Sequence, residues 1–330
     1  MSCDKVTIFF WGTGSTRPAK DRDPSCILVR ACAEVYILDC GEGCQRAFEE
    51  FGVGYNERLT IIVSHLHGDH VLGLLPLLQT LSLAGRSKPV RVVGPLGLWR
   101  ILSRRDFAVN FPLHVTELAT ESGELSLTGS TQSANLVYTR ALHVPLSYSF
   151  VIRFPQRIHL SAERLEREGV PPKLRSILIK KGIVHYGDKI FKLDNFIESI
   201  DPGLVIAYSG DTLPNALFAA KCRKADVLIH EATLAGEASG LGEALHSTAS
   251  EAAEIALKAR VKLLVITHFS PRYRDLEELA REAKRIFPRV IVARKGLSLT
   301  VWFHTPRVIQ VSSQLSFHQQ GSVSSATGTP

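Results

Sequence analysis

Long apolar runs are absent from this sequence, and their absence limits where the protein is expected to work. No stretch approaches about 18 consecutive apolar residues, the length that a membrane-crossing helix requires. The N-terminal stretch "KVTIFFWGTG" also lacks the basic segment, apolar segment and small-residue cleavage site of a secretory signal. We therefore expect a soluble, cytoplasmic protein with no membrane partner.

Paired cysteine motifs are missing as well. The six cysteines are scattered along the chain, and none of them forms a CxxC pair: Cys3, Cys26, Cys32, Cys40, Cys44 and Cys222. This spacing indicates neither a disulfide scaffold nor a zinc finger. Reduced thiols in a cytosol are the simplest expectation.

The composition is that of an ordinary globular protein, 45% hydrophobic and 22% charged, and a chain of this length can bury a large core. Basic charge is concentrated in one segment. Between Arg153 and Lys192, ten Lys and Arg residues and four acidic residues give a net charge of +6, in a chain with a formal net charge of +7. The segment is either a solvated helix and loop or a surface for a phosphate-rich partner.

Short apolar runs alternate with helical patterns in both halves of the chain. Residues near 5–10, 26–30, 35–39, 59–64 and 90–93 have the pattern of strands. In the second half, "LVIAYS", "DVLIH" and "KLLVIT" each precede a helical pattern. The alternation predicts a mixed α/β fold with sheets between helical layers. The final segment, 312–330, is polar and without periodicity, so we expect it to be disordered.

The stretch "IIVSHLHGDH" places four potential metal ligands directly after a buried strand. His65, His67, Asp69 and His70 lie where α/β folds place their chemistry, in the loop that follows a strand. Imidazole and carboxylate groups suit Zn²⁺, but one Zn²⁺ could not take all four from one tight turn and keep an open position. Two metal ions are the economical interpretation. The alternative, turn and helix-capping groups, would seldom cluster histidines in this way.

HLHGDH resembles the HxHxDH signature of the metallo-β-lactamase superfamily, whose remaining ligands are a His, an Asp and a final His, each at a strand end. Candidates follow in that order: His143 in "LVYTRALHV", Asp211 in "YSGDT" and His268 in "VITHFS". The resemblance implies a four-layer αββα sandwich with two Zn²⁺ ions per subunit, although other divalent ions suit the same ligands. It implies the following ligand sets: His65, His67 and His143 for one metal, Asp69, His70 and His268 for the other, and Asp211 as the bridge.

Further stretches resemble ribonuclease Z, a tRNA 3′-processing endonuclease of that superfamily, along most of the chain. "FWGTGSTRPAKDRDPS" resembles its first strand and PxKxRN loop, with Asp23 in place of Asn, which implies that Lys20 and Arg22 contact the tRNA 3′ end. "LDCGEGCQ" resembles its LFDCGEGTQ. "HEAT" and "LHSTASEAAEIA" resemble its HEAT and HST elements, whose glutamate and histidine form a catalytic pair, here Glu231 and His246.

The basic segment also has a counterpart in that family, an arm inserted between the third and fourth ligand motifs. Here it would span 155–198, within a metallo-β-lactamase domain of residues 1–311. "REGVPPKLRSILIKKG" resembles the family's GVPPGPLxGxLKxG without the Gly-Pro step. The resemblance implies an arm that grips precursor tRNA and a homodimer in which one subunit's arm serves the other's metals. The candidate arm contacts are Pro171, Pro172, Lys173, Arg175, Lys180 and Lys181.

The implied reaction is hydrolysis of one phosphodiester in a tRNA precursor, leaving a tRNA 3′ hydroxyl and a trailer with a 5′ phosphate. A hydroxide held by two Zn²⁺ ions would attack phosphorus, and Asp69 would orient or deprotonate the water. His246, held by Glu231, would protonate the leaving oxygen. Two alternatives remain open. A small-molecule hydrolase, such as a lactonase or thioesterase, would not need the basic arm, and a catalytically silent tRNA-binding subunit would usually have lost ligands.

Overall fold

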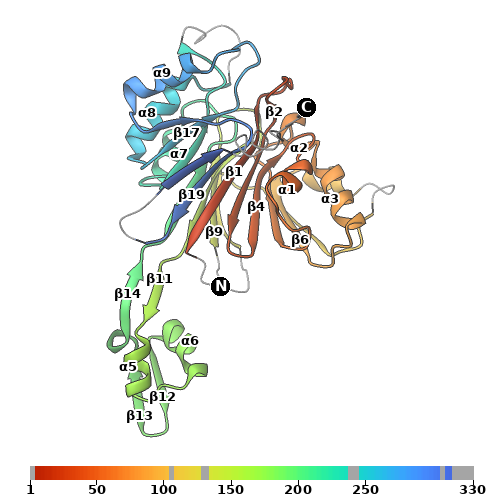
Figure 1. Ribbon diagram of the computed structural model, residues 1–330. Helices are drawn as coiled ribbons and strands as arrows, with labels where there is room; N and C mark the ends of the chain where they lie inside the picture. Colours follow the sequence, from red (N-terminus) through yellow and green to blue (C-terminus); the bar gives the residue numbers. More distant parts are fainter. Residues whose placement is uncertain (1–3, 104–107, 128–133, 237–244, 305–308, 314–330) are drawn as a thin grey trace, which may run out of the picture.

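The computed structural model describes residues 4–103, 108–127, 134–236, 245–304 and 309–313. In the body of the molecule two β-sheets face each other, and helices cover their outer faces (Figure 1). Three buried apolar clusters match these four layers, one between the sheets and one beneath each helical layer. The predicted mixed α/β architecture is confirmed.

The first sheet comes mainly from the N-terminal half of the chain, with two C-terminal strands at one edge. Its path is β20-β19-β1-β3-β4-β5-β6-β7, and β2 pairs with β1. The strands are β1 Lys5–Gly14, β2 Asp23–Pro24, β3 Cys26–Ala31, β4 Glu34–Cys40, β5 Arg58–Ile62, β6 Val90–Pro95, β7 Leu113–Leu118, β19 Leu297–Trp302 and β20 Ile309–Ser313. Strands β4 to β7 are parallel, so their carboxyl ends meet at one edge of the sheet.

The sequence pattern does not indicate β7 or β20, because most of their residues are only partly buried or exposed. Strand β20 includes Ser312 and Ser313, the first two residues of the segment expected to be disordered. Pairing with β19 accounts for this difference, since it gives the backbone of β20 hydrogen-bond partners. A polar sequence by itself does not indicate such pairing. The rest of that segment, 314–330, lies outside the described residues.

The second sheet has the order β18-β17-β16-β15-β10-β9-β8. Its strands are β8 Ser122–Leu127, β9 Ala134–Arg140, β10 Tyr148–Phe154, β15 Leu204–Tyr208, β16 Val227–Glu231, β17 Leu264–Thr267 and β18 Val290–Val292. Strands β15 to β18 are parallel and nearly continuous in apolar residues, as strands buried on both faces are. Their carboxyl ends also lie together.

Among the residues that the structure describes, seven helices of the body cover the two sheets. They are α1 Arg46–Glu50, α2 Gly68–Val71, α3 Leu74–Leu83 and α4 Leu98–Leu102 on the first sheet, and α7 Ala216–Lys221, α8 Ala249–Ala259 and α9 Glu277–Ile286 on the second. Helix α8 begins with a capping box between Thr248 and Glu251. Every helix within the described residues is too short or too polar to cross a bilayer.

The apolar pattern of "HVLGLLPLLQTLSLAG", which starts at the last residue of the HLHGDH motif, predicts one long helix, but the structure divides it at Gly73 into α2 and α3. The backbone N–H of Gly73 donates to the carbonyl oxygen of Cys40 at 2.9 Å. A Cβ at Gly73 would lie 1.9 Å from the carbonyl oxygen of Gly41. This close approach of two backbones locks the metal-ligand loop against the end of β4.

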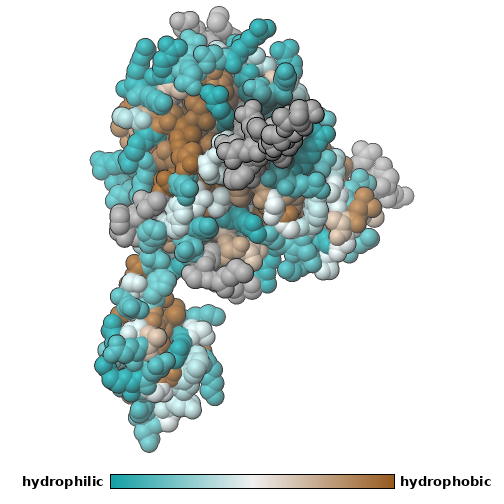
Figure 2. All heavy atoms as spheres, viewed as in Figure 1, coloured by the Kyte–Doolittle hydropathy of each residue, from teal (hydrophilic) through white to brown (hydrophobic). Residues whose placement is uncertain are grey.

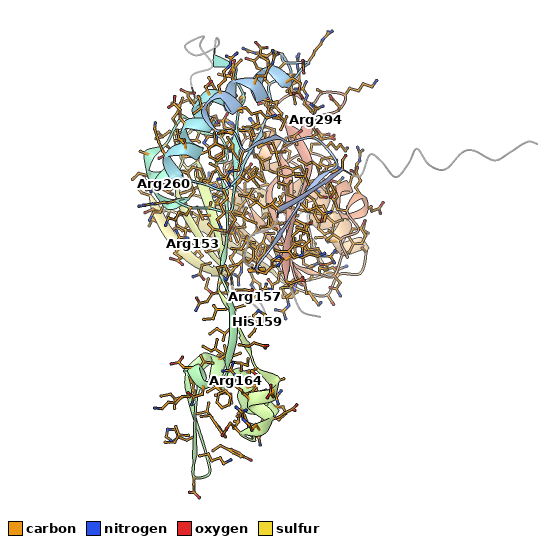
Figure 3. The ribbon with its side chains drawn as sticks, turned by 60° about the vertical axis from the view of Figure 1, so that its left-hand side comes forward. Arg153, Arg157, His159, Arg164, Arg260 and Arg294 are labelled. Carbon is orange, nitrogen blue, oxygen red and sulfur yellow. A yellow bond between two sulfur atoms is a disulfide. The ribbon has the colours of Figure 1, made fainter. Side chains whose placement is uncertain are left out.

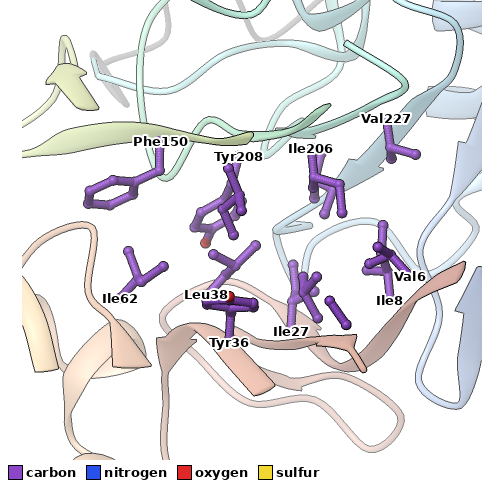
Figure 4. Close-up of a cluster of buried hydrophobic side chains, with 14 of the residues drawn as sticks. Val6, Ile8, Ile27, Tyr36, Leu38, Ile62, Phe150, Ile206, Tyr208 and Val227 are labelled. Atoms are coloured by element: carbon purple, nitrogen blue, oxygen red, sulfur yellow. The ribbon is translucent and has the colours of Figure 1, made fainter. Parts of the chain in front are cut away.

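The main core lies between the two sheets. Alternating residues of β1, such as Val6 and Ile8, point inward and lie opposite Val227 of the second sheet, and Ile62 of β5 lies opposite Phe150 (Figure 4). Because these side chains are almost fully buried, truncating a large one to Ala typically costs about 2–5 kcal/mol of stability. The core therefore fixes the distance between the sheets, whose ends carry the candidate site.

A small subdomain extends from the body between β10 and β15 (Figure 1). Its elements are β11 Arg157–Leu160, α5 Ala162–Arg167, α6 Pro172–Lys181, β12 Ile183–Tyr186, β13 Lys189–Lys192, the 3₁₀ helix η1 Leu193–Asn195 and β14 Ile197–Asp201. Strands β11 and β14 pair with each other and form the connection to the body. The outer elements pack on a core of their own.

The structure corrects the expectation of reduced thiols throughout. Cys26 and Cys44, 18 residues apart in sequence, form a disulfide. Cys26 opens β3 beside Cys40 at the end of β4, and the turn after β4 returns Cys44 to the same place. Sheet pairing, which residue spacing alone does not reveal, brings these thiols together. Cys40 and Cys222 are free and buried.

Candidate metal centre

All seven predicted ligands converge where strands of both sheets end. The loop after β5 and the start of α2 supply four of them, and the segments after β9, β15 and β17 supply one each. The ligand atoms form two groups, within each of which all atoms lie within 4.8 Å of one another: His65, His67 and His143, and Asp69, His70, Asp211 and His268.

The first group contains three imidazoles. Nε2 of His143 lies 3.3 Å from Nδ1 of His67. Nδ1 of His143 is 2.9 Å from the carbonyl oxygen of Leu245, which only accepts, so this nitrogen carries the proton and donates it. The lone pair of His143 Nε2 therefore faces the other two histidines and is free to bind a cation.

The second group is almost completely buried. Nε2 of His268 lies 3.2 Å from Nε2 of His70 and 3.3 Å from Oδ2 of Asp69. Oδ2 of Asp211 is 3.3 Å from Nε2 of His70 and 3.4 Å from Nε2 of His268. The same oxygen is 3.8 Å from Nε2 of His65, in the first group. Asp211 thus lies between the groups, as a bridging ligand would.

Asp39 is a buried carboxylate that the sequence analysis did not single out. Its Oδ2 accepts hydrogen bonds from the hydroxyls of Tyr208 and Ser64, at 2.6 and 2.7 Å, and from Nδ1 of His70, also at 2.7 Å. Because Nδ1 of His70 donates to Asp39, Nε2 is the nitrogen that faces the cluster and can bind a metal ion. A carboxylate inside the fully buried run "EVYILDC" was the signal that could have indicated it.

Three buried polar atoms of the cluster have no hydrogen-bond partner: Nε2 of His65, Oδ1 of Asp69 and Oδ1 of Asp211. Unpartnered polar atoms are costly to bury, and bound cations are a common way of satisfying them. Burial would raise the pKa of Asp69, but the neighbouring imidazoles of His268 and His70 hold that pKa well below its usual range. Ionised carboxylates beside imidazoles are the donor set that Zn²⁺ prefers, so the residues present fit a divalent metal site.

Glu231 and His246 lie at the edge of the cluster. Nδ1 of His246 donates to Oε1 of Glu231 at 3.0 Å, and the backbone N–H of Thr212 donates to the same oxygen at 2.6 Å. Burial would lower the pKa of His246, but the charge of Glu231 raises it to about 9. Nδ1 of His246 is also 3.9 Å from Oδ2 of Asp211. The predicted pair is therefore in contact and next to the ligand groups.

A cavity of about 700 Å³ opens beside these residues. Its lining consists of Ser15, Thr16, Arg17, His67, His143, Val144, Thr233, Leu245, His246, Ser270, Pro271 and Arg272. Two loops form one wall, and they are tied together where the N–H of Phe269 donates to the carbonyl oxygen of Thr13 at 3.0 Å. Each of these loops places an arginine at the cavity.

Lys20 and Arg22, the residues predicted to contact the tRNA 3′ end, do not line this cavity. Lys20 is exposed, whereas Arg22 is 7% exposed and donates from a guanidinium nitrogen to the carbonyl oxygen of Ser270 at 3.4 Å. Arg17 and Arg272 line the cavity instead. Sequence reasoning missed both, although Arg17 belongs to the same loop and Arg272 follows the ligand His268 by four residues.

The predicted arm contacts lie in the small subdomain, away from the ligand groups (Figure 1). Pro171 is the N-cap of α6, and Pro172 is its first residue. Lys180 and Lys181 form its last turn and precede Gly182, which adopts the left-handed conformation that ends the helix. Figure 3 shows Arg157 and His159 on the narrow connection and Arg164 where the connection widens.

Comparison with known proteins finds relatives that cover most of the chain. A family model described as "Anti-Pycsar protein Apyc1" matches residues 6–95. Over 305 residues, the chain is 35% identical to the ribonuclease Z of Methanosarcina acetivorans, covering 90% of this chain and 98% of that protein. It is 34% identical to the ribonuclease Z of Saccharolobus solfataricus, covering 87% of this chain and 96% of that protein.

Solved structures agree. The crystal structure of human tRNase Z, short form, matches with a TM-score of 0.61 and 26% identity, covering 88% of this chain and 98% of that one. A metallo-β-lactamase fold protein from Bacillus subtilis shares the fold, with a TM-score of 0.64 and 18% identity over 90% of this chain and all of that one. The chain has the metallo-β-lactamase fold with two mixed sheets, and it belongs to the ribonuclease Z family of metal-dependent hydrolases.

Proposed function

We propose that this ribonuclease Z removes the 3′ trailer from tRNA precursors by hydrolysing one phosphodiester. The observation that carries the proposal is the convergence of seven candidate histidine and aspartate ligands beside a cavity of about 700 Å³, in a chain of which 90% matches a curated ribonuclease Z. The products are tRNA with a 3′ hydroxyl and a trailer with a 5′ phosphate.

The cluster holds two Zn²⁺ ions in this proposal. His65, His67 and His143 would hold one ion, and Asp69, His70 and His268 would hold the other, with Asp211 placed between the two groups. Bound ions would supply a water of lowered pKa and would offset negative charge on the phosphate. The outer hydrogen bonds of His70, His143 and His268 keep their Nε2 lone pairs directed into the cluster.

Two side chains, Asp69 and His246, accept and donate protons in this proposal. Oδ1 of Asp69 has no partner, so it is available to orient the attacking water and accept its proton. Nδ1 of His246 is occupied by Glu231, which leaves Nε2 as the atom that donates a proton to the leaving ribose 3′ oxygen. A pKa raised to about 9 by Glu231 favours the protonated form of His246 that this donation requires. The bond between phosphorus and the 3′ oxygen breaks, and the phosphate stays on the trailer.

The cavity accommodates the nucleotides next to the cleaved bond. Arg17 and Arg272 stand at its wall, where they contact backbone phosphates. Lys20 contacts the RNA from the same loop. Because Arg22 is turned inward to Ser270, we assign it the role of holding the loop in place rather than binding RNA.

The small subdomain is the tRNA-binding arm of this proposal, inserted in a single catalytic domain. Its helix α6 carries the exposed residues Lys173, Lys180 and Lys181 and the partly buried Arg175. Figure 2 shows hydrophilic residues over much of the visible face of this subdomain. Basic side chains on a projecting surface suit the phosphate backbone of a folded RNA.

The position at which the arm begins supports a homodimer in this proposal. Strand β10 starts at Tyr148, whose N–H donates to the carbonyl oxygen of Ser64 next to the ligand His65. It runs seven residues away from the ligands before the arm starts, roughly 20 Å along the sheet. An RNA gripped by the arm is therefore presented to the ligand groups of a second subunit.

The test is incubation of the purified protein with a tRNA precursor that carries a short 3′ trailer, with and without a chelator, followed by mapping of both product ends. We expect metal-dependent cleavage after the discriminator base and its loss in Asp69→Ala. Zinc binding without cleavage, together with turnover of a lactone or thioester, would instead assign the chain to small-molecule hydrolysis.

A further inference from the structure

Thr233 lies two residues beyond Glu231, at the carboxyl end of β16, and its side chain is 4% exposed. Its Oγ1 is 2.6 Å from Oε2 of Glu231 and 2.8 Å from Nδ1 of His268. The same oxygen is 3.0 Å from the carbonyl oxygen of His268 and 3.4 Å from Nδ1 of His246. One hydroxyl thus touches a predicted metal ligand and both members of the predicted catalytic pair.

The single proton of the Thr233 hydroxyl limits which of these contacts it can donate to. A threonine hydroxyl donates one hydrogen bond and accepts others. Its shortest contact is to the carboxylate of Glu231, an acceptor, so the hydroxyl proton points there. Nδ1 of His268 must then donate to Oγ1, which leaves the Nε2 lone pair of His268 directed at Asp69 and Asp211. The tautomer of His268 therefore depends on Thr233.

The same bond also orders the catalytic pair. Oε1 of Glu231 accepts from the N–H of Thr212 and from Nδ1 of His246, whereas Oε2 receives the hydroxyl of Thr233. Without that hydroxyl, the buried Oε2 would keep only the longer 3.2 Å contact to His246. The carboxylate would be less firmly held, and so would the imidazole that it positions.

We propose that Thr233 is a positioning residue that couples the metal ligand His268 to the Glu231–His246 pair through one hydroxyl. The catalytic half of this inference rests on the proposed function, and the metal half does not. Other ligands have separate outer partners, Asp39 for His70 and the carbonyl oxygen of Leu245 for His143. Loss of the hydroxyl of Thr233 therefore affects metal binding and proton donation together.

The test compares Thr233→Val, which removes the hydroxyl at nearly constant shape, with Thr233→Ser, which keeps it. Thr60→Val, at a buried threonine of β5 outside the network, is the matched control. Zn²⁺ affinity is measured by competition with a chromogenic chelator, and kcat and KM are measured on a tRNA precursor. We expect Thr233→Val to weaken binding of one Zn²⁺ by about 10- to 100-fold. Its kcat should fall by a similar factor with little change in KM.

Thr233→Ser should restore both properties to within a few-fold of the original protein, and Thr60→Val should change neither. Unchanged Zn²⁺ affinity and kcat in Thr233→Val would overturn the inference, as would a Thr233→Ser variant as impaired as Thr233→Val. If Thr233→Val does not fold, Thr233→Ala against Thr233→Ser carries the same comparison. A normal protein that binds Zn²⁺ but cleaves no precursor would refute the proposed function, while the Zn²⁺ comparison would still test Thr233.

Discussion

At the scale of single residues, Asp39 shows how one buried carboxylate determines the state of a metal ligand. It is fully buried, and its φ of 57° is a left-handed conformation that is uncommon for a residue other than glycine. All its side-chain contacts are donors, from His70, Tyr208 and Ser64. Burial would lower the pKa of His70, but Asp211 and Asp39 raise it well above the ordinary value. Asp39 therefore accepts the hydrogen bond of His70 Nδ1 and leaves Nε2 facing the cluster.

We predict that Asp39→Asn weakens Zn²⁺ binding by about 10- to 100-fold. An amide offers one acceptor oxygen and a donor group, so at least one of the present contacts would become an unfavourable pairing of donors. Competition with a chelator measures the change. The control is Asp201→Asn, which alters a carboxylate paired with His159 at the root of the arm. Equal Zn²⁺ affinity in Asp39→Asn and the original protein would contradict the prediction.

At the scale of elements, the arm is a unit with its own small core and its own charge. Leu165, Leu178 and Phe191 are buried in that core, so α5, α6 and β13 hold together independently of the two sheets. The root of the arm is fastened to the body where the guanidinium of Arg157 lies 3.4 Å above the ring of Phe303. Substitutions of basic residues on the outside of α6 should therefore affect binding without disturbing the ligand groups.

Replacing Lys173, Arg175, Lys180 and Lys181 with Ala should weaken precursor binding and flatten its salt dependence. Each lost contact with a phosphate lowers the slope of log affinity against log salt by about 0.7–0.9. Binding measured between low and moderate salt gives the slope. Lys284 and Arg285, in the last turn of α9, provide a control that removes basic charge from the body. An unchanged slope in the arm variant would remove the arm from the binding surface.

At the scale of the whole molecule, the ligand groups connect the two sheets. Side chains that follow β5 of the first sheet meet side chains that follow β9, β15 and β17 of the second. A bound cation is therefore a link between layers that are otherwise held by the apolar core. Ligands that bind only the folded state raise its stability by mass action.

Removal of metal with a chelator should lower the melting temperature, and Zn²⁺ should restore it. At a free concentration 100 times the dissociation constant, one bound ion adds about 2.7 kcal/mol to the free energy of unfolding. Thermal unfolding followed by circular dichroism measures the shift. Asp211→Ala, which lacks the bridging carboxylate, should respond much less. Identical melting curves of the original protein with and without Zn²⁺ would show that these residues do not hold the ion.

Much of the fold and of the ligand set could be predicted from the sequence, because both depend on local patterns. Strands such as β4 and β5 are continuous apolar runs, and His65 to His70 follow one of them directly. Strands β7 and β20 were not predicted, because their sequences contain polar residues and they form strands by pairing with β6 and β19. The disulfide between Cys26 and Cys44 escaped for the same reason, since pairing of β3 with β4 creates it.

The sequence by itself determined which side chains are available to bind metal and where the basic charge lies, because motif spacing and composition are local properties. Only the tertiary structure decided how those side chains are used. It turns Arg22 inward and brings Arg17 and Arg272 to the cavity. It also sets the tautomers of His70 and His268 through Asp39 and Thr233. A tautomer depends on which buried group accepts or donates a hydrogen bond, and that partner is chosen by packing between segments far apart in the chain.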